Sequence, residues 1–115
     1  MSEDLTNLVV EALRDIKAKD IVVLDVAELT DVTEHLVVAS GGSSRQVKAL
    51  ANNVVEEVKK HGVQPLGVEG MDSAEWVLVD LGDVVVHVML PEIRQFYELE
   101  KLWSVRPDQP SEERQ

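Results

Sequence analysis

Two short runs of strand-forming residues, Glu75–Leu81 and Asp83–Met89, flank Gly82 and constrain the fold more than any other feature of the chain. Runs rich in β-branched and aromatic residues on either side of a glycine turn predict a β-hairpin. Because alternate side chains of a strand face opposite sides, the first strand has one entirely apolar side, which we expect to lie beneath helices. That side consists of Val77, Val79 and Leu81.

The opposite side of the hairpin carries a mixed set of side chains. On the first strand it presents Trp76, Leu78 and Asp80. The turn can lie at Leu81-Gly82 or at Gly82-Asp83. In either case, cross-strand pairing places three residues of the second strand on this same side: Val85, His87 and Met89. The same pairing places on the core side the alternating valines, Val84, Val86 and Val88. We call the mixed surface the Trp76 face. It consists of Trp76, Leu78, Asp80, Val85, His87 and Met89.

Large apolar groups beside an Asp and a His, as on the Trp76 face, are typical of a protein-binding surface. All four aromatic residues of the chain lie between Trp76 and Trp103. Trp and Tyr side chains outside a core most often anchor an interface. If a helix or loop covers this side of the sheet, Trp76 is instead a core residue. The pattern favours binding.

Three helices are expected from the spacing of apolar residues. Amphipathic helices are predicted over Leu5–Ile16, where Ser2 is a candidate cap, and over Val47–Val58. Pro91 begins a short final helix that is expected to end at about Trp103. From residue 104 to residue 115 the chain is polar and contains two prolines, so we predict a disordered tail after a domain that spans residues 1–103.

Three further strands complete the predicted sheet. Ile21–Val26 is an apolar β-branched run and is expected to be a buried strand. His35–Ser40 is a second strand, and Val63–Glu69 is a weaker one that Pro65 places at an edge. The order α-β-β-α-β-β-β-α predicts an α/β (α+β) fold of one domain, with a mixed five-stranded sheet and helices mainly on one face.

Composition narrows the possible partners. The formal net charge of −11 argues against binding to a phosphate backbone and favours a basic partner, unless the charge serves solubility alone. The chain contains no cysteine, which excludes disulfides and thiolate metal sites. No apolar run is long enough to span a membrane, and the acidic start resembles neither a secretory signal nor a transit peptide. We therefore expect a cytoplasmic protein with no membrane partner.

The sequence offers only a weak motif for ligand binding or catalysis. Gly41-Gly42-Ser43-Ser44 lies between a strand and a helix, where backbone N–H groups can hold a phosphate. It lacks the spacing and the Lys of a Walker loop, and Ser43 with Gln46 has the spacing of a helix-capping box. A nucleotide-binding or nucleotidyltransferase-like enzyme that uses the Gly42-Ser43 loop is the alternative function.

The carboxylates and histidines show no spacing typical of a metal-binding or catalytic pair. Asp80 and Asp83 are three residues apart across a glycine turn and so do not point the same way. The three histidines, His35, His61 and His87, have no ligand-like spacing. The sequence therefore predicts no catalytic residue, no metal and no cofactor.

The predicted final helix divides into two faces. Phe96 and Leu99 follow helical spacing and are expected to dock on the domain. Arg94, Tyr97 and Glu100 lie three residues apart on a neighbouring face and are candidates for contact with a partner.

Several segments together resemble the ribosomal silencing factor family, also called the Iojap family. They are Val37-Val38-Ala39-Ser40-Gly41, Ser43-Ser44-Arg45-Gln46-Val47, Glu69-Gly70, the hairpin from Trp76 to His87, and Arg94-Gln95-Phe96-Tyr97-Glu98-Leu99-Glu100 with Leu102-Trp103. The resemblance covers nearly the whole chain except the polar tail. The chain departs from the family at Glu34-His35, where an Asp-Tyr pair is usual, which leaves an aromatic contact there in question.

The resemblance implies a nucleotidyltransferase-like fold without catalytic carboxylates, and a translational repressor rather than an enzyme. Family members bind protein L fourteen of the large ribosomal subunit and block its association with the small subunit. Applied to this chain, the resemblance leads us to expect that Trp76, Leu78 and His87 form the apolar centre of the contact, with Tyr97 at its edge. The acidic residues that meet Arg or Lys of the partner are Asp80 and Glu100. The free protein is a candidate homodimer, and little direct contact with nucleic acid is expected.

Overall fold

The computed structural model describes residues 2–28 and 33–97 of the 115-residue chain. It contains three helices in these parts: α1 (Ser2–Asp15), α2 (Ser44–Lys60) and α3 (Pro91–Tyr97). The strands are β1 (Lys19–Asp25), β2 (His35–Ser40), β3 (Gly67–Glu69), β4 (Trp76–Asp80) and β5 (Val84–Met89). No helix within the described parts is both long and apolar enough to cross a membrane. The predicted end of the final helix and the predicted tail lie outside them.

The strands form one five-stranded sheet in the order β1-β2-β5-β4-β3. β2 and β5 pair in parallel, whereas the other three pairings are antiparallel. The sheet is therefore mixed, which confirms the fold predicted from the sequence. β3 lies at an edge, as Pro65 indicated, but it is shorter than predicted.

The prediction that the first strand is buried is wrong. β1 lies at the other edge of the sheet and pairs with β2 alone. Its Val23 is 44% exposed although the β-branched run predicted burial. An edge strand receives cover from one neighbour, so an apolar sequence does not guarantee burial.

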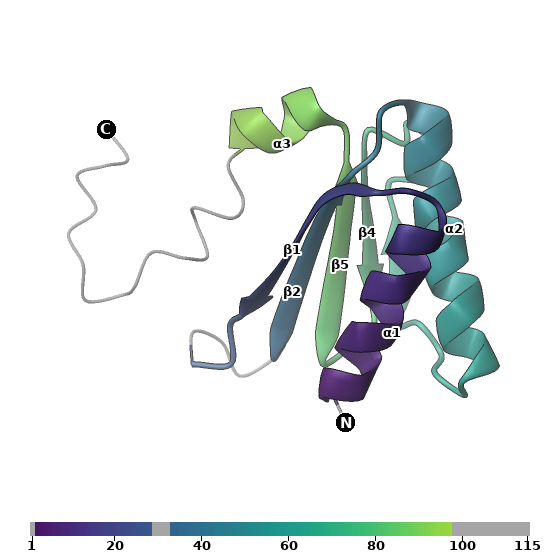
Figure 1. Ribbon diagram of the computed structural model, residues 1–115, viewed down its shortest axis with the longest axis vertical. Helices are drawn as coiled ribbons and strands as arrows, with labels where there is room; N and C mark the ends of the chain where they lie inside the picture. The colour runs from purple at the N-terminus through teal and green to yellow at the C-terminus, as the bar shows by residue number, and fades with distance from the viewer. Residues whose placement is uncertain (1, 29–32, 98–115) are drawn as a thin grey trace.

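Helices α1 and α2 lie side by side on one face of the sheet (Figure 1). α1 buries an apolar stripe against β1, β2 and β5, and α2 buries one against β4 and β5. Val77 and Val79 on β4 are fully buried, as predicted. The stripes consist of Val9, Ala12 and Leu13 on α1, and of Val47, Leu50, Ala51, Val54 and Val58 on α2. This layer is the main core, and it fixes which side of the hairpin faces away from the helices.

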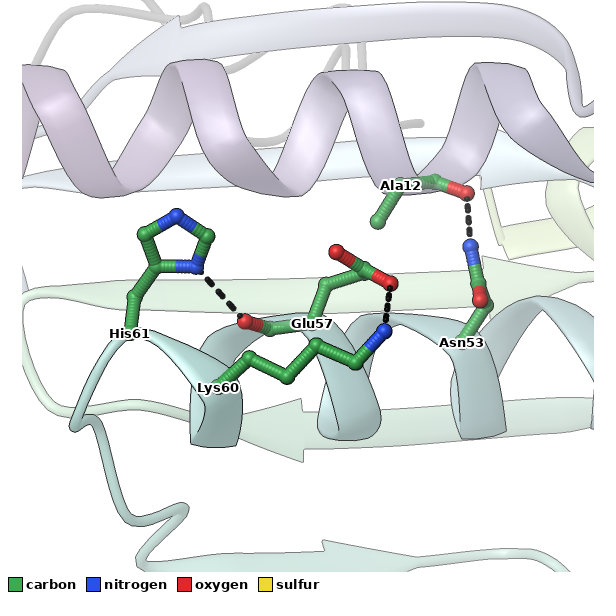
Figure 2. Close-up of polar contacts among 5 residues, drawn as sticks. All are labelled: Ala12, Asn53, Glu57, Lys60 and His61. Atoms are coloured by element: carbon green, nitrogen blue, oxygen red, sulfur yellow. Dashed lines mark hydrogen bonds and ion pairs between the residues drawn. The ribbon is translucent and has the colours of Figure 1, made fainter.

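Polar contacts connect the two helices, and others lie at the C-terminal end of α2 (Figure 2). The Asn53 side chain donates a 2.8 Å hydrogen bond to the main-chain carbonyl of Ala12, which lies on α1. In the last turn of α2, Lys60 pairs with Glu57 at 3.1 Å, and His61 Nδ1 lies 3.0 Å from the Glu57 carbonyl. The Asn53 bond joins two helices, whereas the exposed Lys60–Glu57 pair contributes little stability.

Candidate functional site

The hairpin has the alternation of faces that the sequence predicted. Trp76 pairs with Met89, Leu78 with His87 and Asp80 with Val85. The N–H of Leu81 bonds the carbonyl of Val84 at 2.9 Å, so Gly82 and Asp83 form the turn. All six residues of the Trp76 face therefore lie on the side of the sheet away from α1 and α2.

One part of the Trp76 face is covered, contrary to the expectation of an open surface. Met89 is fully buried and His87 is 7% exposed. They lie on the side of the sheet where a second apolar cluster forms. The buried residues of this cluster are Val26, Leu36, Val38 and Met89. Four partly buried residues pack against the cluster: Leu24, Trp76, Val85 and Ile93. Ile93 comes from α3, which lies at one end of the sheet (Figure 1).

Half-exposed side chains remain along β4. Trp76, Leu78 and Asp80 keep intermediate exposure, and Val85 does so on the neighbouring strand. Glu69 on β3 pairs with Leu78 and adds an exposed carboxylate next to it. The result is a row with two apolar side chains bordered by two acidic ones. Such a row can bind an apolar surface that carries Arg or Lys, and it holds no nucleophile–base pair.

Asp80 is held in place by the hairpin turn. Its Oδ1 atom accepts a 2.9 Å hydrogen bond from the backbone N–H of Gly82. Gly82 adopts a φ of 90°, a left-handed conformation that glycine allows without a steric cost. The carboxylate at this end of the row is therefore oriented before any partner arrives.

His87 receives a hydrogen bond from Trp76. The indole Nε1 donates to the imidazole Nδ1 at 2.9 Å, and the two ring centroids are 5.9 Å apart with a 47° angle between the planes. The sequence predicted that these residues share a face but not that they are bonded. His87 was predicted to lie in the apolar centre of the contact. Because it is 7% exposed, it has little surface available for direct contact with a partner.

Arg94 is buried, and its predicted position on an exposed face of the final helix is wrong. The side chain is 8% exposed, and its Nη1 donates a 2.8 Å hydrogen bond to Oγ of the buried Ser40. The contact joins α3 to the end of β2, so Arg94 holds the helix against the sheet. The side chain of Tyr97 and the whole of Glu100 lie outside the described residues, and their predicted contacts stay predictions.

Two backbone N–H groups at the Gly42-Ser43 loop donate hydrogen bonds within the chain. The N–H of Gly42 donates to Oε1 of Gln46 at 2.7 Å, and the N–H of Gln46 donates to Oγ of Ser43 at 3.2 Å. Ser43 is the N-cap of α2, so the predicted cap is confirmed, although the Gln46 side chain reaches Gly42 rather than Ser43. Gln46 Nε2 also donates to the carbonyls of Ile16 and Lys17, at 3.0 and 3.1 Å. A phosphate bound to the N–H groups of Gly42 and Gln46 would have to displace the first two of these bonds.

At the Glu34-His35 departure, His35 lies away from the Trp76 face. His35 pairs with Val84 of β5, and Val84 belongs to the helix-covered core. Directly paired residues face the same side of a sheet, so His35 points to the helix side. The substitution therefore leaves the composition of the Trp76 face unchanged.

The arrangement defines an α/β protein with a partly open sheet face suited to binding another protein. The family model described as "Ribosomal silencing factor during starvation" matches residues 1–115, and the chain belongs to this family. Within residues 2–28 and 33–97, no group of three His, Cys, Asp or Glu side chains could hold a metal ion.

Curated relatives carry the family name. A ribosomal silencing factor of Chromobacterium violaceum is 54% identical over 101 residues, which cover 88% of this chain and 83% of the relative. The ribosomal silencing factor of Bacillus subtilis is 39% identical, with 91% and 89% covered. A mouse protein named for mitochondrial assembly of the ribosomal large subunit is 40% identical over 87% of this chain and 45% of its own length.

Solved structures agree with this assignment. A crystal structure of a Chromobacterium violaceum protein matches 95% of this chain and 89% of its own, with 52% identity and a TM-score of 0.88. A second structure, from Bacillus halodurans, matches 88% and 94%, with 38% identity and a TM-score of 0.81. The two bacterial relatives are named as ribosomal silencing factors, a name that describes a regulatory protein.

Acidification is expected to destabilise the protein through His87. Burial lowers the pKa of His87 from 6.5 to about 4, so the unfolded chain binds a proton more readily than the folded chain. The stability contributed by neutral His87 is fully present above the unfolded pKa and is lost as the pH falls through the folded pKa. The loss approaches about 3 kcal/mol, at about 1.4 kcal/mol per pK unit.

Urea unfolding at several pH values measures this loss. Carboxylates also titrate below about pH 5, so the matched control is His87→Leu, in which the contribution of the imidazole is absent. The wild-type stability is expected to fall more steeply than that of the variant between about pH 6.5 and 4. Equal slopes for the two proteins would contradict the prediction.

Proposed function

We propose that this protein is a translational repressor that binds the large ribosomal subunit and prevents its association with the small subunit. The observation that carries the proposal is the half-exposed row of Trp76, Leu78 and Asp80 on β4, in a protein of the silencing factor family. The name of the mouse relative supports the large subunit as the partner. The repressor acts in the cytoplasm.

The partner on the subunit is protein L fourteen, a basic ribosomal protein. Trp76 and Leu78 supply the apolar centre of the contact, because a row of half-buried large side chains is the usual form of an interface anchor. Asp80 meets an Arg or Lys of the partner and sets the orientation. Tyr97 and Glu100 extend the contact at its edge. His87 and Arg94 contribute from inside the domain rather than by direct contact.

Repression follows from volume and charge and needs no chemical step. The protein occupies the joining surface, and its net charge of −11 repels the ribosomal RNA of the small subunit. The same charge draws the domain toward a basic ribosomal protein, so association slows as salt rises. The free protein covers its apolar row by forming a homodimer, which dissociates before or on binding to the ribosome.

Sedimentation through sucrose gradients tests the function. Purified protein is added to separated ribosomal subunits, and joining is induced by raising the Mg²⁺ concentration. Co-migration with the large subunit together with a loss of joined ribosomes is the expected result. Migration at the top of the gradient at low salt, with joining unaffected, would rule the proposal out.

The alternative is a nucleotide-binding enzyme that uses the Gly42-Ser43 loop. The internal hydrogen bonds of Gly42 and Gln46 count against it, since they engage N–H groups at the start of α2 that a phosphate would use. Titration calorimetry with ATP and Mg²⁺ separates the two functions. Heat that saturates with nucleotide would support the alternative, and its absence is expected for a silencing factor.

A further inference from the structure

The bond between Trp76 and His87 connects the centre of the proposed contact to the interior of the domain. Trp76 lies on β4 and His87 on β5, and the direct partner of His87 in the register is Leu78. The indole therefore reaches diagonally across the hairpin to the imidazole, at 2.9 Å from Nε1 to Nδ1. Diagonal pairs of this kind are within reach of aromatic side chains.

The two rings differ in exposure. His87 is 7% exposed, and its direct partner on the parallel strand β2, Val38, is fully buried. Trp76 keeps intermediate exposure and packs against the second apolar cluster. The buried ring is thus fixed by its surroundings, and the more exposed ring is bonded to it.

The direction of the bond fixes the protonation state of the imidazole. An indole N–H can only donate, so Nδ1 of His87 must be without a proton and accept. In the neutral ring the proton then lies on Nε2. Burial lowers the pKa of His87 to about 4, which keeps the ring neutral at the pH of a cell. The acceptor is therefore present under working conditions.

We infer that His87 is a positioning residue whose Nδ1 holds the indole of Trp76 in the orientation that the ribosomal contact uses. The inference rests on the proposed function. A side chain that is already oriented loses less conformational freedom on binding, so the affinity is higher than for a mobile indole. Loss of the bond is expected to weaken binding about tenfold, mainly through faster dissociation.

Two substitutions separate the hydrogen bond from the packing of the ring. His87→Leu keeps an apolar side chain in the buried site and removes the acceptor. His87→Asn keeps an acceptor oxygen at the δ position, where Nδ1 lies in histidine. Thermal melts establish that both variants fold before they are compared. His87→Leu is expected to bind the large subunit about tenfold more weakly, and His87→Asn is expected to bind within about threefold of the parent.

The indole N–H signal in ¹⁵N NMR spectra of the free protein reports the bond directly. The chain has two tryptophans, so the variants are made in a Trp103→Phe background in which Trp76 gives the remaining indole signal. His87→Leu is expected to move this signal upfield and to speed its exchange with water. His87→Asn is expected to keep the signal close to that of the parent protein.

A double-mutant cycle completes the test. Trp76→Phe has no indole N–H, so adding His87→Leu to it is expected to change the affinity by less than about twofold. An unchanged indole signal in His87→Leu, or an equal loss of affinity with and without the indole N–H, would overturn the inference. If the parent protein fails to bind the large subunit, the proposed function fails, while the indole signal of the free protein still reports whether His87 holds Trp76.

Discussion

Replacing Leu78 with Lys is expected to weaken binding to the large ribosomal subunit about 100-fold or more. Leu78 lies in the middle of the row, between Trp76 and Asp80 on β4, and is half-exposed. The substitution removes an apolar contact at the centre of the interface and places a cation against a basic partner. Both effects act in the bound state, so the loss combines a missing anchor with charge repulsion.

The matched control for Leu78→Lys is Val23→Lys. Val23 is an exposed apolar residue on β1, and it pairs with Val37, which belongs to the helix-covered core. It therefore lies on the opposite side of the sheet, and its substitution changes the net charge by the same amount. Binding of labelled protein to large subunits at constant salt measures both variants. Equal losses would show that charge alone sets affinity, and full binding of Leu78→Lys would remove the Trp76 face as the contact surface.

Gly70→Ala is expected to destabilise the fold by about 3 kcal/mol or more. Gly70 follows β3 and has a φ of 93°, where an L side chain is strained. A Cβ atom there would lie 2.1 Å from the carbonyl oxygen of Trp76. Because that atom belongs to the backbone of β4, relief of the clash requires the strand to move, and Trp76 would move with it. A loss of this size is a large part of the stability of a small domain.

Two other glycines separate the causes of the expected loss. Gly62 has a φ of 84° but open space at the Cβ position, so Gly62→Ala measures the backbone strain alone, about 1–2 kcal/mol. Gly67 has open space and no positive φ, and Gly67→Ala is expected to change stability by less than about 0.5 kcal/mol. Urea unfolding of the three variants should give the order Gly70, Gly62, Gly67. A Gly70→Ala loss no larger than that of Gly62→Ala would refute the clash.

The predicted faces of the hairpin were correct because they depend on local information. Alternation along a strand has a period of two, and a short turn at Gly82 transmits the parity from β4 to β5. The sequence therefore determined which residues lie under the helices and which six form the Trp76 face. The Ser43 cap was predicted for a similar reason, since the capping bond spans three residues.

The sequence did not determine which residues of that face stay exposed. Burial of His87 and Met89 depends on distant segments, namely α3 and the strands β1 and β2, whose packing no local pattern specifies. Arg94 was misplaced for the same reason, since its partner Ser40 is 54 residues away in the chain. A helical wheel gives the angle between side chains but not the surface against which the helix docks.

The sequence by itself determined the fold class, the sides of the hairpin and the family, because these depend on periodicity, turn chemistry and motifs that adjacent residues specify. The tertiary structure alone decided that β1 is an exposed edge and that His87 bonds Trp76. It also decided that the loop before α2 is closed by Gln46, whose side chain reaches Ile16 thirty residues away. Such contacts join segments that meet through packing of the whole chain, and a partner for a buried polar group is fixed by that packing and not by spacing in the sequence.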